Sequence, residues 1–210
     1  MTEFDKLSIE DFVKELGSAS PAPGGGSTAA LAGALACSLI GMVAKITLKK
    51  KVASNAQNKL EKIVTASEGA RDQFLKLITS DTLAFNEIMK SYKLPKSTDF
   101  EKDARFSSIQ ASTKHAADVP LQTAKLGLQT LEWVKELTEY GSENAITDTG
   151  VAGLMARSAI QGAIWNVQIN LGSIKDNMFV QKTKDEVEKI LTKTNNLWPE
   201  IQKQIKDKID

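Results

Sequence analysis

Residues 18–44 read SASPAPGGGSTAALAGALACSLIGMVA, an irregular turn followed by an uncharged run of small residues. The two prolines and the triplet Gly24–Gly26 exclude regular structure in the turn, because proline lacks a backbone N–H and glycine permits unusual backbone angles. The run that follows, Ser27–Ala44, contains no charged residue. It predicts a buried helix, capped by Ser27 and ending near Lys51, whose small side chains let neighbouring backbones approach closely.

The same uncharged run must be weighed as a membrane span. Its 18 residues fall short of the ~20 that a bilayer requires, and they are mostly alanine, glycine and serine rather than leucine, isoleucine and phenylalanine. The segment before it carries more acidic than basic residues, whereas a secretory signal carries positive charge there. The lone cysteine, Cys37, excludes an internal disulfide and fits a reducing compartment. We therefore expect a cytoplasmic protein without a membrane partner.

Helical periodicity continues on both sides of this run, and no stretch alternates as a strand does. A capping box at Ser8 predicts a short first helix that ends at Gly17. Further helices are predicted over about residues 54–94, 99–139 and 147–177, followed by a charged amphipathic segment. Pro120 should kink or split the helix that contains it. The fold prediction is all-α: one domain over residues 1–210, built as a multi-helical bundle of long antiparallel helices.

The overall charge gives no reason to expect a nucleic-acid partner. The net charge is +1 and aromatic residues make up 6% of the chain, which suits neither phosphate binding nor base stacking. The only histidine, His115, has no cysteine or histidine companion, so a metal site is not expected.

The Gly24–Ser27 turn is the first candidate for ligand binding. Unpaired backbone N–H groups at a helix start, together with the helix dipole, form an anion site, and three glycines would let a ligand lie against the backbone. A flexible linker that ends in an ordinary serine cap explains the same residues equally well, because glycine-rich turns are common.

Asp81 is the second candidate, because it interrupts an apolar helix face. Its neighbours three and four residues away are Leu77, Ile78, Ala84 and Phe85. Burial of a carboxylate among them would raise its pKa toward the range that serves proton transfer. The alternative is a structural carboxylate paired with a cation or a backbone group, and such pairing is the more common explanation.

Polar residues also punctuate the predicted helix over 147–177. Asn166 and Asn170 share a face, where their amides could bind the edge of a heteroaromatic ligand or join helices. Asp148, at the start of that helix, suits the helix dipole, whereas Asp176, near its predicted far end, does not. The cluster Lys49–Lys51 suits the C-terminal end of its own helix and could also attract a polycarboxylate.

The order of these motifs resembles one known family. They are similar to the formiminotetrahydrofolate cyclodeaminase/methenyltetrahydrofolate cyclohydrolase family, which includes the C-terminal domain of formiminotransferase-cyclodeaminase. The matching strings cover nearly the whole chain: Pro21–Ala36, Met42-Val43, Asp81-Thr-Leu-Ala-Phe85-Asn86, Leu94-Pro95, Val119-Pro120-Leu121, Ser142–Ala152 and Asn166–Leu171, with Asp176 beyond. The chain departs from the family at Gly141–Asn144, where the family has Gly-Asn-Pro-Asn, and at Thr147, where it has serine.

The resemblance implies a helical homodimer with its site near the subunit interface, and a tetrahydrofolate derivative as substrate, including polyglutamylated forms. N10 of 5-formiminotetrahydrofolate would attack the formimino carbon and release ammonia, giving 5,10-methenyltetrahydrofolate. No metal is implied, and no cofactor beyond the tetrahydrofolate substrate. One alternative is the related cyclohydrolase step, in which water opens the methenyl bridge to give 10-formyltetrahydrofolate. Another is a non-catalytic folate-binding helical oligomer.

This chemistry needs a proton acceptor for N10 and a proton donor for the departing nitrogen. The predicted catalytic residues are Asp81, Asp148 and Asp176. The turn formed by Gly24, Gly25, Gly26 and Ser27 is expected to hold an anionic or carbonyl part of folate. The glutamate tail is assigned to Lys49 and Lys50, with Lys51. The remaining predicted substrate-binding residues are Phe85, Asn166 and Asn170, and the two asparagines are expected to bind the pterin.

Overall fold

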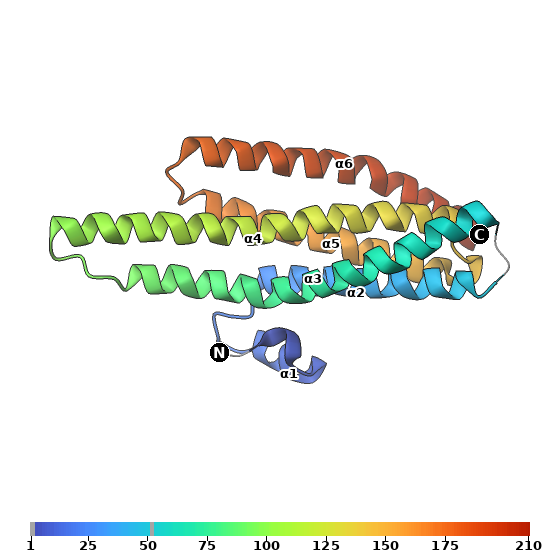
Figure 1. Ribbon diagram of the computed structural model, residues 1–210, viewed down its shortest axis with the longest axis horizontal. Coiled ribbons are helices and arrows are strands. Elements are labelled where there is room, and N and C mark those ends of the chain that lie inside the picture. Colours follow the sequence, from blue (N-terminus) through green and yellow to red (C-terminus); the bar gives the residue numbers. More distant parts are fainter. Residues whose placement is uncertain (1–2, 51–52) are drawn as a thin grey trace.

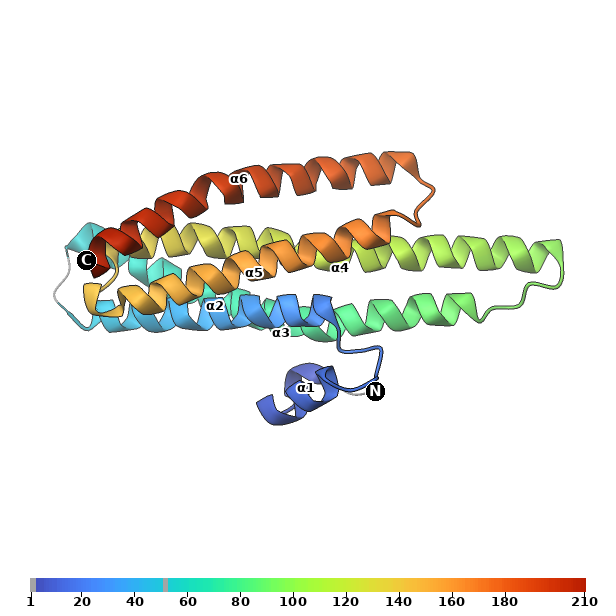
Figure 2. The same ribbon diagram turned by 180° about the vertical axis from the view of Figure 1, so that it is seen from behind.

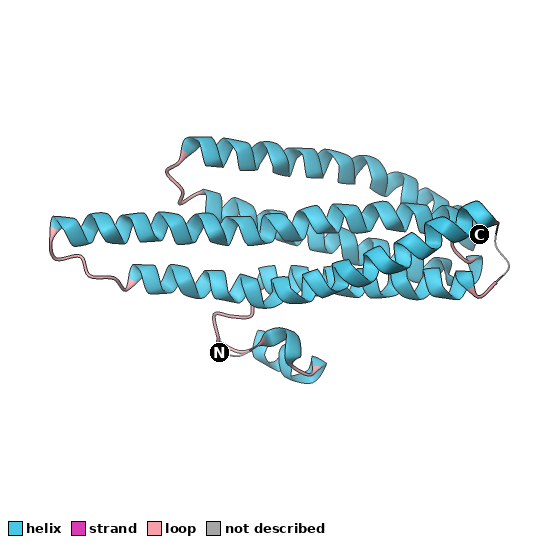
Figure 3. Cartoon of the chain, in the orientation of Figure 1, coloured by secondary structure: helices cyan, strands magenta, loops and turns pink. Residues whose placement is uncertain are grey.

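The computed structural model describes residues 3–50 and 53–210, and these are almost entirely helical, with no strand among them. The long helices lie side by side along one axis, with a short helix beside them (Figure 1 and Figure 2). Among the described residues, the segments outside the helices are loops and turns (Figure 3). The elements are η1 (Phe4–Lys6), α1 (Ile9–Leu16), α2 (Gly25–Leu48), α3 (Ser54–Tyr92), α4 (Asp99–Tyr140), η2 (Glu143–Ala145), α5 (Ile146–Leu171) and α6 (Asn177–Ile209). The all-α prediction is confirmed.

Side-chain caps begin several of the helices. The Ser8 hydroxyl accepts from the Asp11 backbone N–H at 3.1 Å and begins α1, as the sequence predicts. Thr98 and Glu101 form a complete capping box at the start of α4, which pairs donors that a helix start otherwise leaves unpaired. Local sequence therefore determines where these helices begin.

The predicted start of the small-residue helix is wrong. α2 begins at Gly25 with Gly24 as its N-cap, so Ser27 lies inside the first turn and does not cap the helix. The Ser27 hydroxyl instead lies 3.1 Å from the Ile78 carbonyl oxygen on α3. The Ser27 side chain therefore bonds to a partner on another helix, whereas the capping rule predicts a bond to the local backbone.

The predicted end of the helix over residues 147–177 is also wrong. α5 ends at Leu171 rather than near residue 177, because Gly172 and Ser173 favour a helix less than the residues before them. Asp176 then caps α6 by accepting from the Phe179 N–H at 3.1 Å. Asp176 therefore lies at the start of a helix, where the dipole favours a carboxylate, and not at the end of one.

α4 runs unbroken through Pro120, so the predicted split does not occur. Proline has no N–H for the carbonyl four residues earlier, which is that of Ala116. The Asn170 side chain on α5 donates to this carbonyl at 2.8 Å. A neighbouring helix thus supplies the donor that the proline lacks.

α2 packs against three other long helices of the bundle, α3, α4 and α5. It is long and apolar enough to cross a membrane by length and composition, yet 56% of its most apolar window is buried within the bundle. A Cβ on Gly33 would lie 2.3 Å from the Phe74 ring on α3, so small residues do bring the two backbones close. Burial among its neighbours therefore accounts for the uncharged run.

Replacing Gly33 by alanine is expected to lower the free energy of unfolding by about 1–3 kcal/mol, the range for overpacking a core. The Phe74 ring that the new methyl would meet is fully buried. Urea denaturation measures the change. The control is Gly69→Ala on α3, because a Cβ at Gly69 meets no atom within 4 Å. Equal midpoints for the two variants would contradict the close packing of α2 on α3.

Candidate functional site

A cavity of about 320 Å³ opens at the N-terminal end of α2, where the turn before this helix meets α3, α4 and α5. The predicted site residues that line it are Gly24, Gly25, Gly26, Asp81, Phe85, Asn166 and Asn170. The other lining residues are Pro21, Ala22, Thr82, Ile88, Ala116 and Ile169. Segments that are distant in sequence therefore converge on one pocket.

Asp81 lies against the backbone of α2 in this cavity. A Cβ on Gly26 would lie 2.1 Å from Asp81 Oδ1, so only glycine leaves room for the carboxylate. The Ser27 hydroxyl lies 3.0 Å from Asp81 Oδ2, and the Ser27 backbone N–H also donates to this carboxylate. The first turn of α2 thus holds the carboxylate in place.

Burial raises the pKa of Asp81, and the hydrogen bonds from Ser27 reduce this rise without cancelling it. No charged neighbour contributes to the pKa of Asp81. The alternative of an ion-paired structural carboxylate therefore lacks a cation within the described part of the chain. A carboxyl group with a raised pKa exchanges protons closer to neutral pH than an exposed aspartate does, which suits a general acid or base.

Asn166 and Asn170 both line the cavity, and their side-chain amide nitrogens already have partners. The side-chain N–H of Asn166 donates to the Gly162 carbonyl oxygen, with 2.8 Å between nitrogen and oxygen. Asn170 donates to the carbonyls of Ala116 and Asn166 at 2.8 Å and 3.0 Å. Because a carbonyl can only accept, both nitrogens must face these partners, which leaves the Oδ1 atoms to accept from a ligand. The pair therefore favours a ligand edge that carries N–H donors.

The start of α2 adds backbone donors to the same pocket. Gly24 is the N-cap and has no side chain that could accept from the first N–H groups of the helix. Gly25 and Gly26, which follow it, both line the cavity. Their position at the positive end of the helix dipole suits a carbonyl or anionic group of a ligand, and binding there stays a prediction.

Asp176 lies outside this cavity and joins two helices. Its carboxylate accepts from Lys114 Nζ on α4 at 2.8 Å as well as from the Phe179 N–H. The hydrogen bond from Lys114, and then that from Phe179, lowers the pKa of Asp176. This arrangement holds the carboxylate in its charged form as an anchor for α6, and a catalytic role for Asp176 stays a prediction.

Asp148, Lys49 and Lys50 lie far from the cavity within the chain. α2 has 24 residues and is therefore about 36 Å long, with the cavity at its first turn and the lysines after its last. Lys50 Nζ donates to the Ser142 hydroxyl at 2.8 Å, just before η2, and Asp148 lies in the first turn of α5. Lys51 lies outside the described residues. The structure therefore does not bring these groups to the Asp81 cavity of the same chain.

Several lining residues escaped the sequence prediction, although some carried a signal. Ile88 follows Asp81 by seven residues and Ile169 follows Asn166 by three, so helical spacing puts each on the face of its partner. Ala116 had no local signal, because it reaches the cavity through the packing of α4 against α5.

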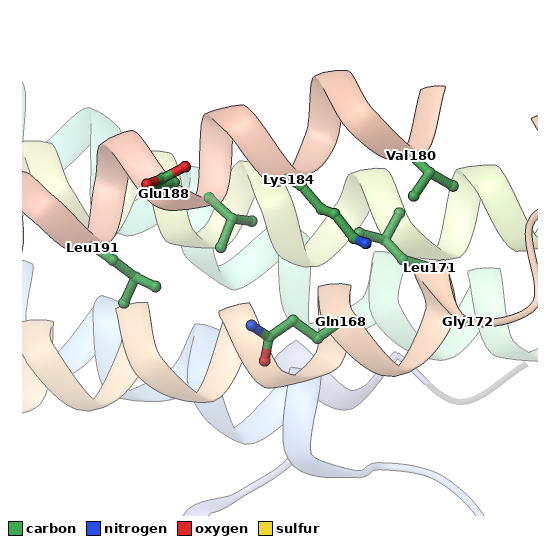
Figure 4. Close-up of a pocket in the computed structure, with 8 residues that line it drawn as sticks. Gln168, Leu171, Gly172, Val180, Lys184, Glu188 and Leu191 are labelled. Carbon is green, nitrogen blue, oxygen red and sulfur yellow. The ribbon is translucent and has the colours of Figure 1, made fainter. Parts of the chain in front are cut away.

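A groove of about 410 Å³ lies between α5 and α6 (Figure 4). Apolar side chains from both helices line it, among them Leu171, Val180 and Leu191, and Lys184 extends from α6 toward Leu171. None of the predicted site residues lines this groove. Gln168, Lys184 and Glu188 add polar side chains to the groove, which therefore differs from the Asp81 cavity in the residues that line it.

Two other reactive side chains, His115 and Cys37, lie outside the Asp81 cavity. Within residues 3–50 and 53–210, no three His, Cys, Asp or Glu side chains lie close enough to hold a metal ion. His115 Nδ1 lies 2.8 Å from Glu87 on α3. Burial raises the pKa of the Cys37 thiol to about 11, which keeps it protonated and unreactive.

Several known proteins are similar to this chain. A family model described as Formiminotransferase-cyclodeaminase matches residues 8–189. A methenyltetrahydrofolate cyclohydrolase of Methylorubrum extorquens is 35% identical over 203 residues, which cover 97% of this chain and 98% of that protein. The formimidoyltransferase-cyclodeaminase of Rattus norvegicus is 32% identical over 184 residues, 88% of this chain. The chain spans only 34% of the length of the rat protein.

The fold also has a solved counterpart. The crystal structure of formiminotetrahydrofolate cyclodeaminase from Thermotoga maritima matches with a TM-score of 0.89 at 30% identity. The match covers 98% of this chain and 99% of that chain. The arrangement of the helices is therefore shared over nearly the full length of both chains.

Proposed function

This chain belongs to the formiminotransferase-cyclodeaminase family of folate cyclodeaminases and cyclohydrolases, and we propose that it converts 5-formiminotetrahydrofolate to 5,10-methenyltetrahydrofolate and ammonia. Membership confirms the resemblance seen in the sequence. The observation that carries the proposal is Asp81, a carboxyl group with a raised pKa and no charged neighbour, in a cavity otherwise lined by two amides, one threonine, glycines and apolar side chains.

In the proposed reaction, Asp81 accepts a proton and then donates one. N10 attacks the carbon of the cationic, protonated formimino group, and ionised Asp81 accepts the proton that N10 loses. The carbon is then bonded to N5, N10 and an amino nitrogen. Protonated Asp81 donates a proton to this amino nitrogen. The bond between that nitrogen and the carbon breaks, ammonia departs, and the cationic methenyl bridge between N5 and N10 remains. Protons and charge balance without a redox partner.

The asparagine oxygens orient the substrate in this proposal. The pterin carries an amino group and ring N–H donors, which Asn166 Oδ1 and Asn170 Oδ1 would accept. The pterin carbonyl would lie toward the backbone N–H groups at the start of α2. Phe85 and Ile88 offer an apolar wall for the ring. The edge of the pterin that leads to N5 and N10 would then face Asp81.

The cyclohydrolase step is the second candidate function. The observation that favours it is the Methylorubrum extorquens relative, which carries that name and is matched along 98% of its length. In this reaction Asp81 would accept a proton from the water that attacks the methenyl carbon. It would then donate a proton to N5 as the N5–carbon bond breaks, while the hydroxyl of the tetrahedral carbon loses its proton to solvent and becomes the formyl carbonyl on N10.

Two assays distinguish these activities. With 5-formiminotetrahydrofolate, a cyclodeaminase forms the methenyl absorbance band and releases an equal amount of ammonia. With 5,10-methenyltetrahydrofolate, a cyclohydrolase accelerates the loss of the same band above the uncatalysed rate. Saturable folate binding with no change in either assay would indicate a non-catalytic folate-binding oligomer and would overturn the enzymatic proposal.

We further propose that the chain forms a homodimer through the exposed face of α2 and α5. Exposed large apolar side chains on these two helices are Leu35, Met42, Ile46, Val151, Leu154, Trp165 and Ile169. α2 and α5 pack against each other, and Ile169 also lines the cavity. An apolar surface of this kind is typical of a subunit interface, and pairing there would cover the rim of the cavity.

Trp165→Glu is expected to give monomers in size-exclusion chromatography with light scattering, because burial of an unpaired charge opposes association. Phe100→Glu is the control, since Phe100 is 83% exposed on α4, outside the proposed interface. A dimer that persists in Trp165→Glu, or a monomeric wild type, would contradict this interface.

A further inference from the structure

Ser27 lies behind Asp81, out of reach of the cavity. Its side chain is 0% exposed, and it is not among the residues that line the cavity. The Ser27 hydroxyl oxygen lies 3.0 Å from Asp81 Oδ2 and 3.1 Å from the Ile78 carbonyl oxygen. Thr82 Oγ1 lies 3.5 Å away on the same face of α3. Ser27 therefore contacts the proposed proton carrier without reaching a substrate.

A serine hydroxyl has one proton, whereas the Ser27 hydroxyl has both a carboxylate and a carbonyl within hydrogen-bond distance. We propose that Ser27 is a positioning residue whose hydroxyl turns between the Asp81 carboxylate and the Ile78 carbonyl as Asp81 releases and takes up a proton. When Asp81 is ionised, Ser27 donates to it. When Asp81 is protonated, Asp81 donates to the Ser27 oxygen and Ser27 donates to Ile78. Asp81 is then hydrogen-bonded in both of its protonation states, and no heavy atom has to move between them.

No charged side chain competes with Ser27 for Asp81 in the described part of the chain. Apart from Asp81, the residues that line the cavity on α2, α3, α4 and α5 are glycines, apolar residues, Thr82 and two asparagines. Ionisable groups on the neighbouring elements have other partners: Thr79 donates to Asp5 of η1, His115 of α4 contacts Glu87, and Lys114 of α4 contacts Asp176. Within the described residues, burial raises the pKa of Asp81 and hydrogen bonds from Ser27 lower it.

The catalytic part of this inference rests on the proposed function, in which Asp81 is ionised in one step and protonated in the next. A neighbour that only donates would favour the ionised state, and an apolar neighbour would favour the protonated state. A hydroxyl both donates and accepts, so it serves the two states in turn. Because neither backbone has to move, the carboxylate stays aligned through the cycle.

Titration of the Asp81 carboxyl carbon by ¹³C NMR tests the hydrogen bond without an activity measurement. In Ser27→Ala the ionised carboxylate loses a donor, so the pKa of Asp81 is expected to rise above its wild-type value. Ser67→Ala is the matched control, because Ser67 is also 0% exposed but its hydroxyl donates to Val64. That control is expected to leave the titration unchanged. An Asp81 titration that is unchanged or lowered in Ser27→Ala overturns the proposal.

Turnover tests the role of Ser27 in the reaction. Ser27→Ala is expected to lower kcat roughly tenfold or more near neutral pH, the effect of losing one hydrogen bond to a charged group. KM should hardly change, and the acid limb of the kcat/KM profile should move to higher pH together with the titration of Asp81. Ser67→Ala should show neither effect.

The same variants distinguish failure of this inference from failure of the proposed function. In an Asp81→Asn background, Ser27→Ala is expected to cause no further loss of the residual rate, because Ser27 acts through the carboxylate. A further loss there, or a lower kcat without a shift of the acid limb, contradicts the positioning role. If the wild type turns over neither folate, the proposed function fails, and the NMR titration still decides whether Ser27 controls protonation of Asp81.

Discussion

Gly26→Ala is expected to reduce kcat/KM by roughly a hundredfold or more, the effect of displacing a reacting group by about 1 Å. The added Cβ would lie 2.1 Å from Asp81 Oδ1, 2.6 Å from its Cγ and 2.8 Å from its Oδ2. Either the carboxylate leaves its position or the start of α2 moves away from α3. Both movements separate Asp81 from the Ser27 donors and from the cavity.

The same substitution is expected to lower the free energy of unfolding by about 1–3 kcal/mol, because the contact is buried and tightly packed. Gly69→Ala is the matched control: it also adds a methyl to a helix but meets no atom within 4 Å. Alanine favours a helix over glycine by about 0.5–1 kcal/mol, so this control should be as stable as wild type or more stable. A Gly26→Ala enzyme with wild-type kcat/KM would contradict the assigned position of Asp81.

Asp81→Asn is expected to reduce kcat by about 10²–10⁴-fold, the contribution of a general acid–base group. The asparagine amide keeps the size of the side chain but cannot exchange a proton near neutral pH. KM for the folate should change much less than kcat, because the asparagines and the backbone of α2 would still bind the ring. Initial rates in the methenyl band, with both folates, measure the loss.

The same variant is expected to be at least as thermally stable as wild type at neutral pH. An acid whose pKa is raised on folding stabilises the fold only while it is protonated, and this contribution is lost as the pH rises through the folded-state pKa. Burial raises the pKa of Asp81, so its ionised form destabilises the native state at higher pH. Replacement by a neutral amide removes that penalty.

Asp72→Asn is the control for Asp81→Asn, because Asp72 lies on the same helix but is exposed and contacts Arg71 at 2.9 Å. It should retain wild-type activity. Wild-type activity in Asp81→Asn, or a fall in its thermal stability that accounts for the lost activity, would contradict a role for this carboxyl group in proton transfer.

Much of the fold was predictable because the relevant signals are local. Caps such as Ser8 and Thr98 act on backbone groups within three residues, and the helices begin where these residues indicate. The uncharged run before Lys45 predicted a buried helix, and α2 packs against α3, α4 and α5. These features depend on neighbours in sequence, so they can be read without a structure.

The errors arose where a side chain has a distant partner. Ser27 has the chemistry of an N-cap, but its hydroxyl lies against Asp81, 54 residues later. Pro120 has the chemistry of a helix breaker, but Asn170 on another helix donates to the carbonyl that the proline leaves free. Local rules cannot register such partners, and in both cases the distant partner, Asp81 or Asn170, lines the cavity.

The site was predictable only as a set of residue types. Asp81 stood out because a carboxylate interrupts an apolar face, but the sequence could not show that Gly26 leaves room for it or that no cation pairs with it. Nor could the sequence show which of the three predicted carboxylates lie together. The structure places them apart: Asp81 lines the cavity, Asp176 caps α6, and Asp148 lies in the first turn of α5.

A crystal structure with bound 5-formyltetrahydrofolate, whose formyl oxygen stands in for the formimino nitrogen, tests the central claim most directly. The account predicts the pterin in the cavity at the start of α2, with N–H donors toward Asn166 Oδ1 and Asn170 Oδ1 and with N10 within hydrogen-bond distance of Asp81. A pterin bound in the groove between α5 and α6, or bound with N10 away from Asp81, would contradict it.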